Sequence, residues 1–168
     1  CSYLAALKYD DALREAVESE EIRVDIKALM LMCGIYDLEV LLEGTTLFGV
    51  IPKTAEMVFN FKLKKDFSNI KEFKYYDYIS PAKFVNDKWC STFICWADDD
   101  IVCQNQGEPM AEKLKAAVPY FDFYHIDGLL NNHCFHLNFG TGNKPAVECM
   151  EKSLEFLRTV TQKETIRV

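Results

Sequence analysis

The sequence lacks any apolar run long enough to cross a membrane. Its uninterrupted apolar stretches are short, such as Ala28–Cys33, whereas a spanning helix needs about 20 consecutive apolar residues. An excess of positive charge is also missing, because 19 Lys and Arg stand against 26 Asp and Glu and give a net charge of −7. This balance argues against nucleic acid or an anionic membrane surface as the main partner.

Paired cysteine motifs, internal repeats and low-complexity segments are absent too. The cysteines number seven, and no two of them form a Cys-x-x-Cys pair. A disulfide framework normally shows an even count in a short secreted chain, and no signal peptide is visible. We therefore expect reduced thiols and a cytoplasmic protein.

The length of 168 residues predicts a single domain over residues 1–168 that buries its own core without disulfides. Strands covered on both faces are predicted by three short, almost continuously apolar runs. These runs are Ile26–Ile35, Ser91–Ala97 and Tyr120–Ile126.

Helical periodicity separates and flanks these strands. It predicts helices over Ser2–Glu18, Thr54–Leu63, Gln104–Ala117 and Pro145–Val160. The alternation predicts an α/β fold, a three-layer α/β/α arrangement with a mostly parallel sheet.

The strand at Ile26–Ile35 is expected to leave a long apolar edge. Because an exposed apolar edge is an aggregation hazard, we expect a partner to complete the sheet. Either upstream strands or a second chain could do so. Cys1 already opens a segment with helical periodicity, and this favours a missing upstream segment.

Two groups of polar residues follow neighbouring predicted strands. Asp98, Asp99 and Asp100 come directly after one strand, and His133 comes a few residues after the next. Functional groups of open α/β sheets lie at the carboxyl ends of strands. An acid and a histidine there suit a catalytic pair, in which the carboxylate orients the imidazole and the imidazole takes a proton. The alternative is a polar loop with a surface histidine.

Five segments in order resemble the C-terminal half of an α/β-hydrolase of the esterase/lipase type. The first is similar to the helix after the nucleophile elbow, the second to the next strand with its Tyr-Asp-Leu ending, and the third to a Ser-Pro turn. The last two are similar to the family's acid loop and its His-x-Phe motif. They are Cys1–Leu7, Leu31–Leu38, Tyr78–Pro81, Phe93–Val102 with Gln104, and His133–Phe135.

The resemblance implies Asp99 as the triad acid, with Asp98 and Asp100 as alternatives, and His133 as the general base. His136 does not match the motif and is expected to be a core or loop histidine. Residues 38–74 fall where the family carries a lid or an acyl-pocket insertion, although a plain packing helix fits equally well.

The serine that the family places before the matched region is not in this chain, and neither is the oxyanion-hole loop. Ser2 lacks the preceding strand and flanking glycines of a nucleophile elbow. We therefore expect half of a carboxylic-ester hydrolase that is inactive alone, works through an acyl-enzyme and needs no cofactor. Its expected substrate is a small ester with an apolar group. The alternative is a non-catalytic binding or scaffold module on a hydrolase fold.

Two other sites are disfavoured. Cys1 as an N-terminal nucleophile would normally end a strand in a stacked-sheet fold, but here it opens a predicted helix. A metal site from His125, His133, Cys134 and His136 lacks the tight paired spacings of zinc sites.

Overall fold

Three parallel strands form the centre of the protein in a computed structural model that describes residues 1–44, 56–57, 60–127 and 133–165. The strands are β1 (Ala28–Met32), β2 (Ser91–Ala97) and β3 (Phe121–Ile126), in the order β1-β2-β3. The predicted α/β class and parallel sheet are thereby confirmed.

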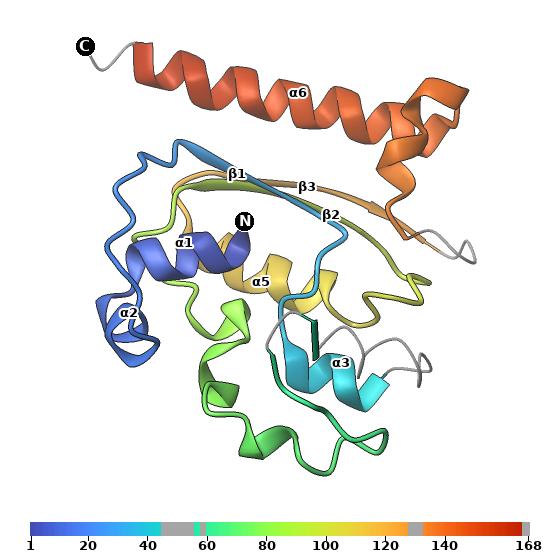
Figure 1. Cartoon of the computed structure of the whole chain (residues 1–168). Helices are drawn as coiled ribbons and strands as arrows, with labels where there is room; N and C mark the ends of the chain where they lie inside the picture. The colour runs from blue at the N-terminus through green and yellow to red at the C-terminus, as the bar shows by residue number, and fades with distance from the viewer. Residues whose placement is uncertain (45–55, 58–59, 128–132, 166–168) are drawn as a thin grey trace.

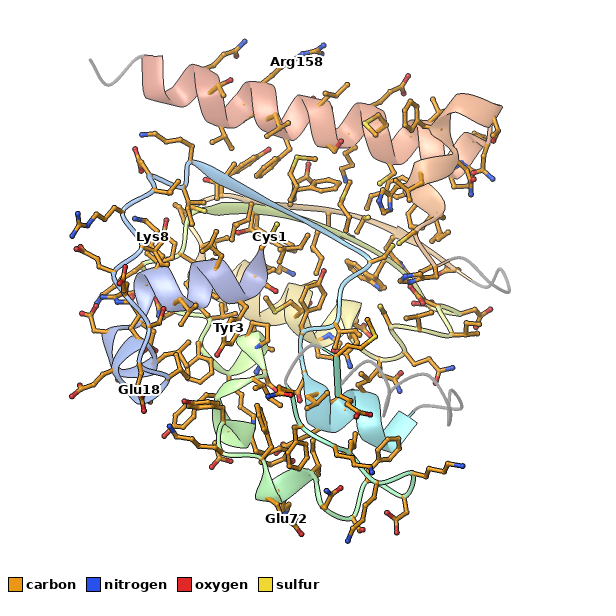
Figure 2. All side chains as sticks on the ribbon, in the orientation of Figure 1. Cys1, Tyr3, Lys8, Glu18, Glu72 and Arg158 are labelled. Carbon is orange, nitrogen blue, oxygen red and sulfur yellow. The ribbon has the colours of Figure 1, made fainter. Side chains whose placement is uncertain are left out.

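Helices cover both faces of this sheet (Figure 1). The long helix α6 (Lys144–Thr165) lies over one face, and α1 (Ser2–Tyr9) and α5 (Gly107–Ala117) lie under the other. Side chains fill both interlayer spaces (Figure 2).

Successive residues of β2 feed two separate apolar cores, because side chains alternate across a strand. Ile94 packs with α5 in a cluster that also contains Leu114. Phe93 and Cys95 pack on the opposite face, in a cluster that we call the α6-side cluster. It comprises Cys33, Phe93, Cys95, Ala97, Phe135, Cys149, Phe156 and Val160.

The predicted helix over Ser2–Glu18 is two helices, and this prediction was wrong in one respect. Asp10 takes an extended conformation (φ −129°, ψ 104°) between α1 and α2 (Asp11–Ala16). Its carboxylate accepts a hydrogen bond from the backbone N–H of Leu13 at 2.8 Å. The aspartate therefore caps the second helix and ends the first.

Strand β1 is shorter than the predicted Ile26–Ile35. It ends at Met32, and Cys33 follows with a left-handed backbone (φ 48°). Such a conformation breaks the alternation of side chains along an extended strand. Within the part of the chain that the structure describes, β1 is one edge strand of the sheet and β3 is the other.

The excursion between β1 and β2 begins with α3 (Leu38–Gly44) and continues through three short 3-10 turns. These turns are η1 (Ile70–Glu72), η2 (Tyr76–Tyr78) and η3 (Pro81–Lys83). The predicted helix over Thr54–Leu63 lies partly outside the described residues, and residues 60–63 are not helical.

The segment after β3 was predicted as a loop over Leu129–Gly142. Part of it lies outside the described residues, and the rest contains the 3-10 helix η4 (Phe135–Thr141), which leads into α6. None of the helices in the described ranges is long and apolar enough to span a membrane.

Candidate active site

The three consecutive acids after β2 occupy different environments. Asp98 and Asp99 are exposed, whereas Asp100 is 1% exposed. The backbone N–H of Asp100 donates to the carbonyl of Ala97 at 3.3 Å. This tight turn directs the third acid into the protein.

The carboxylate of Asp100 is fully engaged. Its Oδ1 accepts hydrogen bonds from the backbone N–H groups of Val102 at 2.8 Å and Cys103 at 2.9 Å. Nδ1 of His133 lies 3.0 Å from its Oδ2 and 3.1 Å from its Oδ1. A buried charge needs such partners, and here a backbone turn and an imidazole supply them.

His133 follows β3 and is more exposed than its acid partner, since 36% of its side chain is accessible. Its second ring nitrogen, Nε2, lies 3.4 Å from Sγ of the half-buried Cys134. One nitrogen thus contacts the carboxylate, and the other lies beside the thiol of Cys134. A histidine that acts as a base between an acid and a nucleophile needs this arrangement.

The expected partner of His133 was Asp99, and here the geometry corrects the sequence reasoning. Asp99 is exposed, and the acid that contacts His133 is Asp100, one of the two alternatives. The reason is the turn after Ala97, which directs Asp100 inward and leaves the two preceding carboxylates in solvent.

The other alternative, Asp98, pairs with a different histidine. Its Oδ1 lies 2.7 Å from Nε2 of His125 on β3, and Asp127 lies 3.3 Å from the same nitrogen. The His125 ring stacks on Trp96, with centroids 4.8 Å apart. The imidazole of His125 therefore packs against Trp96 at the end of the sheet. The side chain of Asp98 is 51% exposed.

A buried thiol lies beside the Asp100–His133 pair. Sγ of Cys103 donates to the carbonyl of Cys33 at 3.1 Å and lies 3.8 Å from Nδ1 of His133. Burial, followed by the charge of Asp100, raises the pKa of Cys103 to about 12. This thiol is therefore protonated at neutral pH and packs beside the pair as a neutral group.

His136 is buried, as expected, with its ring edge-on to Phe135. Its Nδ1 lies 3.8 Å from Sγ of Cys33. A hydrogen bond from Cys95, together with His136, lowers the pKa of Cys33 to about 5, although burial opposes this. The pKa of Cys95 is raised, first by its hydrogen bonds with Cys149 and Cys33 and then by burial.

Three groups in the described parts of the chain have the donors for a metal ion. They are Cys33, Cys95 and His136; Asp100, Cys103 and His133; and Asp98, His125 and Asp127. The set considered from the sequence, with His125, His133 and His136 together, is thus divided among three places.

Gln106, to which sequence reasoning gave no role, holds the start of the excursion in place by hydrogen bonds. The side-chain oxygen of Gln106, just before α5, accepts from the backbone N–H groups of Tyr36 at 2.8 Å and Asp37 at 2.7 Å. Its amide donates to the carbonyl of Asp37 at 3.0 Å. No sequence pattern could have indicated this contact, because the partners are far apart in the chain.

The predicted lid or acyl pocket over residues 38–74 is only partly visible. Two aromatic residues of this segment, Phe48 and Phe59, lie outside the described residues. Phe61 packs against Phe73 at a centroid distance of 5.3 Å, and Met57 is 80% exposed. The described part of the excursion thus has both an aromatic contact and an apolar side chain in solvent.

Comparison with known proteins identifies no relative: no family model, curated protein or solved structure matches the chain. The functional argument therefore rests on the geometry of the site.

Proposed function

We propose that this chain supplies the acid and the base of a Ser-His-Asp carboxylic-ester hydrolase. The observation that carries the proposal is the contact of the buried Asp100 carboxylate with Nδ1 of His133 at 3.0 Å. The pair lies after the carboxyl ends of two neighbouring parallel strands, where open α/β sheets hold their functional groups. The earlier resemblance to α/β-hydrolases supports the same interpretation.

In this mechanism Asp100 holds the proton of His133 on Nδ1 and stabilises the imidazolium that forms. Nε2 then takes the proton of a serine hydroxyl as the serine attacks the ester carbonyl. The alcohol leaves with that proton, and an acyl-enzyme remains. His133 next deprotonates water, which hydrolyses the acyl-enzyme and frees the serine. No cofactor takes part.

The serine is proposed to come from a segment outside this chain. Strand β1 lies at one edge of the described sheet, and a segment that pairs with this edge would extend the sheet as we expected from its apolar sequence. The aromatic side chains of the excursion favour an ester with an apolar group. The seven free thiols suit a reducing compartment such as the cytoplasm.

Cys134 is a poor substitute for that serine despite its place beside Nε2 of His133. A cysteine nucleophile acts as the thiolate and needs a lowered pKa. Burial raises the pKa of Cys134, and the neighbouring charges of Cys33 and Asp100 raise it further. A hydroxyl nucleophile, which gives up its proton only during attack, fits the site better.

A fluorophosphonate serine probe tests the proposal on the native protein from its source. We expect it to label a serine on a polypeptide that is joined to this chain or copurifies with it. Asp100→Asn should slow labelling about 10³-fold or more, since a triad whose acid becomes an amide holds the wrong imidazole tautomer.

The matched controls are Asp99→Asn and His125→Gln, which should label within about twofold of the wild type. His133→Gln should abolish labelling. If no serine is labelled, or if labelling survives His133→Gln, the ester-hydrolase proposal fails. The non-catalytic binding or scaffold role would then replace it.

A further inference from the structure

A second constellation, made of other side chains, adjoins the Asp100–His133 pair through the thiol of Cys103, which donates to the carbonyl of Cys33 at 3.1 Å. The ligand atoms of Cys33, Cys95 and His136 all lie within 4.8 Å of one another. All three residues are buried, with exposures of 5%, 0% and 8% respectively. Two thiols and an imidazole thus converge where water is excluded.

The backbone explains why these groups meet. Consecutive residues of a strand normally point to opposite faces, but the left-handed turn at Cys33 breaks this rule. As a result Cys33 lies in the α6-side cluster, and Met32 packs against the same cluster. Cys95 pairs in register with Met32 on the neighbouring strand, and η4 brings His136 against them.

A thioether sulfur lies beside the Cys95 thiol of this group. Sδ of Met32 lies 3.4 Å from Sγ of Cys95, and Nδ1 of His136 lies 3.8 Å from Sγ of Cys33. Ligands at ordinary metal–sulfur and metal–nitrogen bond lengths in a tetrahedron are about 3.8 Å apart for two sulfurs and about 3.6 Å apart for sulfur and nitrogen. The two observed separations are close to these values, and the ligand atoms of Cys33, Cys95 and His136 all lie within 4.8 Å of one another.

We propose that Cys33, Cys95, His136 and Met32 form a binding site for Cu(I). Thiolate and thioether sulfurs favour this soft ion, whereas structural zinc sites use cysteine, histidine and carboxylate ligands without a thioether. Each thiol that coordinates gives up its proton to solvent. The ion enters as Cu(I), so binding transfers no electron.

The test is an anaerobic Cu(I) titration of the full chain in competition with the chromophoric chelator bicinchoninate. It is done in a Cys1→Ser background, because the exposed thiol of Cys1 could bind copper independently. We expect one Cu(I) per chain. Cys33→Ser and Cys95→Ser should each weaken binding at least about 100-fold, since loss of even an outer-shell partner costs roughly 10–100-fold.

Cys90→Ser is the matched control. Its thiol packs on the opposite, α5 side of the sheet, and this variant should keep the affinity within about twofold. Equal losses in Cys90→Ser and Cys95→Ser, or unchanged affinity in both, would overturn the site.

Two further pairs of variants separate ligation from folding. Leucine replaces methionine with little change in volume, so Met32→Leu should keep the circular dichroism spectrum and weaken Cu(I) binding, whereas Met110→Leu in the other core should not weaken it. His136→Gln should reduce the affinity, and His133→Gln should not. If His133→Gln alone reduces it, the copper belongs to the Asp100–Cys103–His133 group. If Zn(II) binds stoichiometrically and Cu(I) does not, the copper assignment is wrong.

Discussion

The carboxylate of Asp100 links two parts of the chain that meet only in the folded protein. It accepts two backbone N–H groups from its own turn and contacts the imidazole of His133, while it is 1% exposed. Its neighbour Asp99 is exposed. Replacing these two adjacent aspartates should therefore change the free energy of unfolding by different amounts.

We expect Asp100→Ala to lower the free energy of unfolding by about 2–4 kcal/mol, because it leaves buried donors without their charged acceptor. Asp99→Ala should change it by no more than about 0.5 kcal/mol. Urea denaturation of the two variants measures this difference. Equal stabilities would show that the buried carboxylate does not hold the turn.

The sequence could indicate that an acid and a histidine follow adjacent strands, but it could not distinguish between three successive aspartates. That choice depends on the direction of a turn at Ala97, and each step along a turn changes the direction of the side chain. The contact of Cys33 with His136 was beyond sequence reasoning for a related reason. It depends on a left-handed residue with no glycine or asparagine to mark it.

The helices and strands were also predictable where a local sequence pattern marks them, and were missed where a cap or a tertiary contact decides. The apolar runs predicted β2 and β3 nearly to the residue. Strand β2 is largely buried, and such burial leaves a continuous apolar signature, whereas β3 is only partly buried and is marked by its aromatic residues. The break at Asp10 was missed, because helical periodicity continues through it while the side chain acts as a cap. Helix α3 was missed too, in a stretch with mixed patterning.

Helix α5 begins at Gly107, where the absence of a side chain permits close packing on β2. A Cβ added there would lie 2.2 Å from Cγ and 2.4 Å from Cβ of Trp96. The Trp96 ring stacks on Phe123 and His125. These stacking contacts limit how far the Trp96 ring can move away from an added Cβ. The clashing atoms, Cβ and Cγ of Trp96, are also the side-chain atoms closest to the Trp96 backbone.

Gly107→Ala should therefore destabilise the protein by about 1–3 kcal/mol through overpacking, although alanine favours helices more than glycine. Gly140→Ala is the control, because nothing lies within 4 Å of its added Cβ. It should be neutral or stabilise by up to about 1 kcal/mol. Thermal unfolding of both variants measures the two effects, and a Gly107→Ala protein as stable as the wild type would contradict the close packing.

For the whole molecule, three apolar runs interleaved with helical patterns were enough to predict a parallel sheet with helices on both faces. This prediction succeeds because each β-α-β connection has few alternatives. The long excursion between β1 and β2 was less predictable. Its contacts, such as Gln106 with Tyr36 and Asp37, join distant segments without a local signature.

The parallel register also sets an order of assembly along the chain. Thr92 pairs with Phe121 across a connection that contains a single helix, whereas Ala28 pairs with Ser91 across a connection about twice as long. Each doubling of the length of a closed loop costs about 0.6 kcal/mol of conformational entropy. We expect the β2-α5-β3 unit to form in the folding transition state and β1 to dock afterwards. Stopped-flow kinetics should then show Leu114→Ala mainly slowing folding and Leu29→Ala mainly speeding unfolding. The reverse pattern would place the nucleus at β1, and the final step in making this sheet would then be the closure of its shorter connection.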